Sequence, residues 1–337
     1  MIIQNDFTKL LNLRYPIVMA PLFLVSNEAM VIEAIEAGIL GCFPSLNYRS
    51  PGELDDVLKR LNKLLEERAG KQGTYGMNLI VQRANPWFEK HLEICISNKV
   101  PVVITSLGSP KSTIDAVHTY GGKVFCDVTN LEHARKCQEA GCDGFVAVGQ
   151  GAGGHAGPYP LIILTEALKQ EFPGTPVLAA GGIAHGRAML SVLASGASAA
   201  YCGTRFIAST EASVSQEYKD AVVNYRMDDI VLTERISGTP CSVINTEFAK
   251  KIGTKQNWFE RILSKNPRTK KYFKMLIQRR GFNWLEGAVK PGSYESLWCA
   301  GQSVEMIHDI KPVKEIVNQM VSEFEKAFAE LEKTIIR

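Results

Sequence analysis

Short runs of consecutive apolar residues alternate, over the first two thirds of the chain, with longer stretches whose apolar residues recur at helical spacing. Consecutive apolar positions are typical of strands buried on both faces of a parallel sheet. Eight such runs predict strands at residues 16–20, 38–43, 75–81, 100–106, 123–128, 144–149, 176–180 and 199–206. The stretches between and after them predict helices at 27–37, 53–68, 86–98, 111–120, 131–140, 161–170, 187–195 and 215–225.

Eight successive strand-then-helix units predict an α/β fold that closes as a (β/α)8 TIM barrel. A doubly wound open sheet is the alternative, but it normally contains fewer units. Glycines after Ala37, Ala140 and Ser195 stand where three of the helices should end, just before the next strand, because glycine accommodates the backbone that terminates a helix. The predicted barrel domain spans residues 1–226.

After about Met227 the alternation of predicted strands and helices stops, so a mostly helical C-terminal extension is expected. Residues 227–310 predict a basic, irregular or helical extension over the rim of the barrel. Within it, residues 250–281 carry eleven Lys or Arg against one acid, Glu260, with interleaved aromatic residues Trp258, Phe259, Tyr272 and Phe273. This segment is interpreted as a solvated helical face beside a phosphate-handling rim. An anionic membrane surface or an acidic carrier protein are the other partners it could fit.

Residues 311–337 predict an amphipathic helix that packs on the barrel. One stripe contains Ile316, Val317, Met320, Val321, Phe324, Phe328, Leu331 and Ile335. Such a stripe covers the body of the protein or forms the seam of a homodimer.

Composition narrows the class of protein. A chain of 337 residues that is 45% hydrophobic can bury a full core, and a net charge of +3 is too small to indicate nucleic-acid binding. The eight cysteines form no CxxC pair and no metal spacing, which favours a reducing compartment. Neither a signal peptide nor a membrane span is recognisable in the sequence. We therefore expect a cytoplasmic enzyme or binding protein without a metal.

Candidate chemistry collects where the predicted strands end, which is the catalytic face of a TIM barrel. Gly181-Gly182 follows the seventh strand, and Gly203-Thr204 lies at the end of the eighth. Backbone N–H groups at glycines approach an anion without side-chain clash, and helix N-termini behind the loops favour negative charge. These two loops predict a phosphate-binding cup.

The sixth strand runs into a glycine-rich loop, residues 149–157, that contains His155. The loop includes a formal GxGxxG, but Pro158 and Pro160 follow at once and no acid stands about 20 residues on, so it is not a dinucleotide fingerprint. His155 is predicted to be an acid or base, since imidazole titrates near neutrality. His185 is expected to begin a helix and to be structural.

Five motifs in order resemble the nitronate monooxygenase family, formerly called 2-nitropropane dioxygenases. They are residues 19–23 (MAPLF), 76–79 (GMNL), 151–157 (GAGGHAG), 180–183 (AGGI) and 203–206 (GTRF), with a weaker match at residues 298–302 (WCAGQ). The wider family includes FMN-dependent enoyl-acyl-carrier-protein reductases and NADH:quinone reductases.

The resemblance implies a barrel that binds FMN without a covalent bond. The implied cofactor-binding residues are Ala20, Pro21, Leu22, Asn78, Gly153, Gly181, Gly182, Gly203 and Thr204. Further candidates for contact with the cofactor, at or near strand ends, are Thr105, Asp127, Gln150, Ala180 and Cys202. His155 matches the family's active-site histidine, which takes the α-proton of a nitroalkane or stabilises an anionic nitronate. The implied reaction is one-electron oxidation of a nitronate by FMN, followed by O2 chemistry that yields a carbonyl compound and nitrite.

The chain departs from the family pattern at two positions: Gly151 replaces a common acid and His185 a common aspartate. Three functions follow as hypotheses. The first is nitronate oxidation with O2; the second is NAD(P)H-dependent reduction of enoyl thioesters or quinones, for which an acyl-carrier protein would be the partner; the third is a flavin-binding module without turnover. A titratable His155 in the loop argues against the third.

Overall fold

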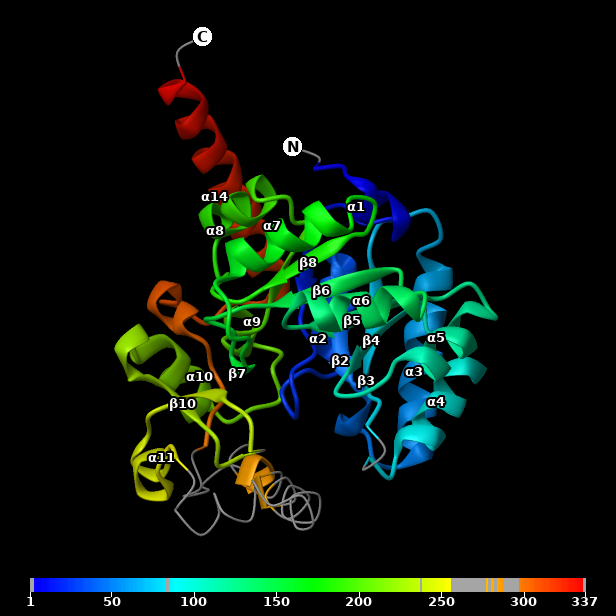
Figure 1. Cartoon of the computed structure of the whole chain (residues 1–337), viewed down its shortest axis with the longest axis horizontal. Helices are drawn as coiled ribbons and strands as arrows, with labels where there is room; N and C mark the ends of the chain where they lie inside the picture. Colours follow the sequence, from blue (N-terminus) through cyan, green and yellow to red (C-terminus); the bar gives the residue numbers. More distant parts are fainter. Residues whose placement is uncertain are drawn as a thin grey trace.

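The computed structural model of the chain describes residues 3–82, 85–236, 238–255, 277, 280–281, 284–287 and 297–335. Eight parallel strands close into a barrel, because β1 pairs with both β2 and β9 (Figure 1). The predicted TIM barrel is therefore confirmed. Its strands are β1 (Ile17–Met19), β2 (Leu40–Pro44), β3 (Thr74–Ile80), β4 (Val102–Ser106), β5 (Lys123–Val128), β6 (Gly144–Val148), β8 (Val177–Ala180) and β9 (Ala199–Cys202).

Helices that follow the strands cover the outside of the barrel (Figure 1). They are α2 (Glu28–Glu36), α3 (Pro51–Glu67), α4 (Phe88–Ser97), α5 (Lys111–His118), α6 (Leu131–Glu139), α7 (Leu161–Glu171), α8 (Gly186–Ala194), α9 (Thr204–Ile207) and α10 (Gln216–Asn224). Gly38, Gly141 and Gly196 follow α2, α6 and α8 with φ of 80°, 92° and 93°. These glycines therefore end the helices in the left-handed conformation that the sequence predicted.

The barrel interior is filled by inward-facing side chains from alternate positions of each strand. Ile104, Phe125, Val146 and Leu178 belong to one buried cluster. The short helix α1 (Asp6–Leu10) adds Phe7, which packs edge-on against Phe125 with 5.6 Å between ring centroids. Apolar packing therefore closes one end of the barrel and leaves the end at the strand C-termini for function.

Part of the extension forms a sheet that the sequence reasoning missed. Strands β10 (Ile230–Thr233) and β11 (Cys241–Ile244) pair antiparallel, and β11 also pairs with β7 (Gly154–His155) from the glycine loop. The short helices η1 (Ser45–Asn47), η2 (Met227–Asp229), α11 (Glu247–Ile252) and η3 (Gln302–Met306) complete the connections. Most of the basic segment 250–281, with its four aromatic residues, lies outside the described residues.

The last helix, α14 (Val313–Thr334), packs on α8 and extends beyond the body of the protein (Figure 1). Ile316, Val317 and Met320 are buried, whereas Phe328 and Leu331 remain 40% and 49% exposed. The stripe therefore contacts the barrel along its first half only. Among the described residues, no helix is both long enough and apolar enough to cross a membrane.

Candidate active site

A large cavity lies at the C-terminal ends of the barrel strands, with a volume of about 1080 Å³. This volume is at the upper end for small-molecule sites in proteins. Most of the predicted site residues line it: Ala20, Pro21, Leu22, Asn78, Thr105, Asp127, Gly153, His155, Ala180, Gly181, Gly182, Gly203 and Thr204. The barrel therefore brings residues that are far apart in sequence to one cavity.

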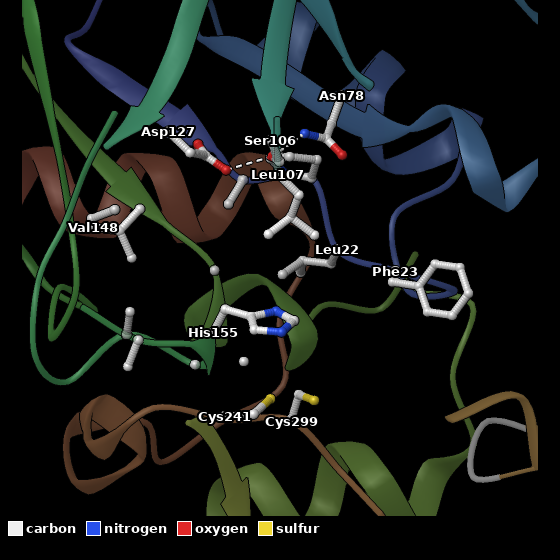
Figure 2. A pocket seen from close by; sticks show the side chains of 18 of the residues that line it. Leu22, Phe23, Asn78, Ser106, Leu107, Asp127, Val148, His155, Cys241 and Cys299 are labelled. Atoms are coloured by element: carbon white, nitrogen blue, oxygen red, sulfur yellow. Dashed lines mark hydrogen bonds between the residues drawn. The ribbon is translucent and has the colours of Figure 1, made fainter. Parts of the chain in front are cut away.

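The floor of the cavity consists of side chains at the strand ends: Asn78, Ser106, Asp127, Val148, Ala180 and Tyr201. Three of these form a hydrogen-bonded row across β3, β4 and β5. Asn78 Nδ2 donates to Ser106 Oγ over 2.8 Å and to the Ile104 carbonyl over 3.1 Å. Ser106 Oγ in turn donates to Asp127 Oδ2 over 2.5 Å (Figure 2). One half of the floor is thus polar, while Val148 and Ala180 make the other half apolar.

The position of Asp127 is unfavourable for an ionised carboxylate, because the side chain is largely surrounded by protein. Burial raises the pKa of its carboxyl from 3.8 to about 6, and the Ser106 hydrogen bond lowers it by a smaller amount. The side chain keeps some exposure to the cavity, yet protein surrounds it on its other sides. The pKa of the neighbouring Tyr201 phenol is raised by burial and, secondarily, by the Asp127 charge. Both groups are therefore largely neutral in mildly acidic solution.

The predicted phosphate cup lies at the ends of β8 and β9. Gly182 has a φ of 71°, and a Cβ built there would meet no atom within 4 Å, so its backbone faces open space. Thr204 is buried, and its Oγ1 accepts a hydrogen bond from Gly301 N over 3.0 Å, which leaves the hydroxyl proton available. An anion could therefore approach the backbone at Gly182 and the hydroxyl of Thr204.

The roof of the cavity comes from outside the barrel and consists of His155, Ile236, Cys241, Leu297 and Cys299. Pairing of β7 with β11 sets His155 opposite Cys241. Its exposed imidazole points into the cavity between Leu22 and the two thiols (Figure 2). The floor row and His155 thus face the same space from different walls.

Gly301 holds the glycine loop in place. A Cβ built on Gly301 would lie 2.3 Å from the Gly151 carbonyl oxygen and 2.8 Å from Gly153 N, so the two backbones are in direct contact. The stacked rings of Tyr218 and Trp298, 5.3 Å apart, lie beside this segment, and the Tyr218 hydroxyl donates to the Cys299 carbonyl. The weakly matching residues 298–302 therefore form the support of the loop that carries His155.

Two predicted cofactor residues do not line the cavity. The Gln150 side chain donates to the Pro158 carbonyl over 2.8 Å, and Cys202 is buried in the core around the barrel. His185 caps α8, since its Nδ1 accepts from Ala188 N over 3.1 Å. The structural role predicted for His185 is therefore confirmed, whereas the side chains of Gln150 and Cys202 are directed to other partners.

Sequence reasoning missed several residues of the cavity. Ser106 stood at a predicted strand end but was not selected, although an inward position beside Asp127 was readable from the strand period. Tyr201 was hidden inside the apolar run of β9. Cys241 and Cys299 gave no signal, because their approach to His155 depends on tertiary pairing. No cluster of three or more potential metal ligands occurs among the described residues.

Comparison with known proteins agrees with this architecture. The nitronate monooxygenase family matches residues 50–323. A probable nitronate monooxygenase of Staphylococcus aureus is 26% identical over 287 residues, which cover 74% of this chain and 80% of the relative. A (3aS,4S,5R,7aS)-5-hydroxy-7a-methyl-1-oxo-octahydro-1H-indene-4-carboxyl-CoA dehydrogenase of Mycobacterium tuberculosis is 24% identical over 95% of both chains. The solved structure of FabK from Thermotoga maritima superposes with a TM-score of 0.84 at 30% identity, covering 99% of this chain and all of that one.

The closed barrel, its mouth cavity and these relatives define a flavin oxidoreductase of the TIM-barrel class. Within that class, the chain belongs to the nitronate monooxygenase family.

Proposed function

We propose that this enzyme uses bound FMN and O2 to oxidise alkyl nitronates to carbonyl compounds and nitrite. The observation that carries the proposal is the position of His155, whose imidazole faces the same cavity that offers an anion cradle at Gly182 and Thr204. When bound, FMN supplies the acceptor for the electrons of the substrate. The family match and the Staphylococcus aureus relative support the same reaction.

The residues present fit FMN. Gly181, Gly182, Gly203 and Thr204 would hold the phosphate, because they offer backbone N–H groups, open space and a hydroxyl donor. Ala20, Pro21, Leu22 and Asn78 line the cavity between that cradle and the floor and would contact the rest of the cofactor. The Leu22 backbone is fixed in turn, since Ser26 Oγ accepts from Leu22 N over 2.9 Å.

His155 is the group that would handle the substrate's proton and charge. As a neutral imidazole it can take the α-proton of a nitroalkane, and as an imidazolium it can attract an anionic nitronate. Leu22 lies beside it in the cavity (Figure 2), and Val148 lines the floor. The low polarity of these surfaces strengthens the attraction between the imidazolium and an anion.

An anaerobic mixing experiment tests the proposal. The FMN-loaded protein is mixed separately with ethylnitronate, NADH and NADPH, and the visible flavin band is followed. Bleaching by ethylnitronate alone, with recovery and nitrite release on admission of O2, is the expected result. Bleaching by a pyridine nucleotide and not by ethylnitronate would contradict it.

Reduction of an enoyl thioester by NAD(P)H is the second candidate. FabK, an enoyl-acyl-carrier-protein reductase, is 30% identical to this chain over nearly its whole length. In addition, Ile236, Leu285 and Leu297 extend the cavity with apolar surface, and its volume lies at the upper end for small-molecule sites. Reoxidation of an NADPH-bleached flavin by crotonyl thioester under argon would favour this function over the first.

A further inference from the structure

The polar half of the floor has unsatisfied hydrogen-bond acceptors. Both hydrogens of the Asn78 amide are donated, to Ile104 O and Ser106 Oγ, and the Ser106 hydroxyl is donated to Asp127 Oδ2. Among the described residues, neither Asn78 Oδ1 nor Asp127 Oδ1 has a donor partner. Neither oxygen is fully buried, since the fully buried atoms without partners belong to other residues. The row therefore presents acceptors, and no donor, to the cavity while Asp127 is ionised.

Among the described residues, none supplies a compensating charge to Asp127. The groups that face it are the Ser106 hydroxyl from β4, the Tyr201 phenol from β9 and the Cys137 thiol from α6. Burial raises the pKa of the Tyr201 phenol, and a hydrogen bond to Cys126 together with burial raises that of the Cys137 thiol, so neither becomes a charge near neutral pH. Lys136 and His133 line the outer cavity wall, but Lys136 pairs with Glu132 and His133 contacts Thr129. A buried carboxylate that lacks a cation needs a donor from whatever fills the cavity.

We infer that Asp127, held by Ser106 and Asn78, is a binding site for the imide N–H of the flavin ring. The pyrimidine end of the isoalloxazine is the only part of FMN's ring system that carries an N–H between two carbonyls, so it is the donor that matches an acceptor row. This inference rests on the proposed function for the presence of FMN, and it adds the residue that recognises the flavin ring. Ser106 is a positioning residue, because its hydroxyl hydrogen is donated to the Asp127 carboxylate.

A comparison of FMN with N3-methyl-FMN tests the inference by equilibrium binding, without substrate or turnover. At pH 8 the wild type should bind FMN roughly 10-fold to 100-fold more tightly than the N3-methyl compound, since a hydrogen bond to an ionised group is lost. The ratio should fall between pH 8 and pH 5 as Asp127 becomes protonated. Changes in the phosphate ionisation affect both compounds equally and cancel in the ratio.

Variants separate the hydrogen bond from a steric effect of the methyl group. Asp127→Asn should reduce the ratio and abolish its pH dependence, and Ser106→Ala should shift the pH dependence upward, because the hydroxyl stabilises the ionised carboxylate. Asp115→Asn, which removes an exposed carboxylate on α5, is the charge control and should leave both unchanged.

A ratio that is the same at pH 5 and pH 8 in the wild type would overturn the inference, even if Asp127→Asn does not fold. The same holds for a pH-dependent ratio that persists in Asp127→Asn. Protein that binds no FMN at all would instead refute the proposed function. If the protein binds FMN but the ratio of its affinities for FMN and N3-methyl-FMN does not change with pH, only the role of Asp127 is refuted.

Discussion

The floor and the roof of the cavity are built on different principles. The floor consists of strand ends in one closed sheet, where neighbouring strands fix the register of Asn78, Ser106 and Asp127. The roof assembles β7, β11 and residues 297–299, which are separated by more than 50 residues from one another in sequence. Hence the floor inherits its geometry from the fold, whereas the roof depends on a few close contacts. Under the proposed function, the flavin ring would lie against the floor, and His155 at the roof would act on the substrate.

The largest effect is expected at the roof. His155→Asn should lower turnover of a neutral nitroalkane by roughly 10²-fold to 10⁴-fold, the usual contribution of a positioned base. FMN affinity should stay within about 2-fold, because the asparagine leaves the floor and the cradle intact. Steady-state nitrite release and flavin fluorescence measure the two quantities.

His185→Asn is the matched control for that variant, since asparagine is also a good N-cap and α8 should persist. Equal loss of turnover in both variants would show that histidine removal as such, rather than the roof position, causes the effect.

The junction between loop and roof should be nearly as sensitive. In Gly301→Ala the new methyl group would lie 2.3 Å from the Gly151 oxygen, so backbone must move. We expect a loss of about 3 kcal/mol in the free energy of unfolding, at the upper end for overpacking, and weaker FMN binding. Urea unfolding and fluorescence titration measure these changes.

Gly52→Ala provides the comparison for Gly301→Ala, because a Cβ at the exposed first turn of α3 meets nothing within 4 Å. It should be neutral or slightly stabilising. Similar behaviour of the two variants would contradict the idea that the roof is held by close backbone contact.

At the floor, stability without flavin should depend on pH through Asp127. Its folded pKa of about 6 lies above the unfolded value of 3.8, so the unfolded chain loses its proton first as pH rises. Stability attributable to this group therefore falls between pH 4 and pH 6, by up to about 3 kcal/mol. Asp127→Asn should be the more stable protein at pH 7.5 and should lose that advantage at pH 4. A gap between the two urea midpoints that does not change with pH would refute this account.

The smallest effect is expected from the ion pair of Arg49 and Glu286, which joins the barrel to the extension. The side chains are 43% and 32% exposed, so Arg49→Ala should cost about 0.5 kcal/mol or less. Thermal unfolding at low and high salt checks this value. A loss above about 2 kcal/mol would mean that charge, and not backbone packing, attaches the roof.

The floor was largely predictable from sequence because the signals are local. The apolar runs placed β3, β4 and β5 within two residues of their observed bounds, and the strand period points Asn78 and Asp127 inward. The sequence therefore also predicted the face of the barrel on which the site lies, since the strands of a barrel all end on one face.

The roof was not predictable for the opposite reason. Ile230–Thr233 and Cys241–Ile244 are short runs that contain β-branched residues, and the seven residues 234–240 between them end in Gly238, Thr239 and Pro240, so this pattern could have indicated the hairpin. Nothing local, however, indicates that β11 pairs with two residues of a glycine loop almost ninety positions earlier. That pairing is a tertiary interaction, and the contacts of Cys299 with β11 are another.

Gly186 has a consequence for how the protein is synthesised. A Cβ there would lie 2.1 Å from the Met320 carbonyl oxygen, and Gly186 N donates to Glu323 Oε2, so α8 meets α14 backbone to backbone. More than 120 residues must leave the ribosome after α8 before that neighbour exists. During this interval the seventh unit of the barrel carries an uncovered apolar face, and it is the region where a nascent chain would most need a chaperone.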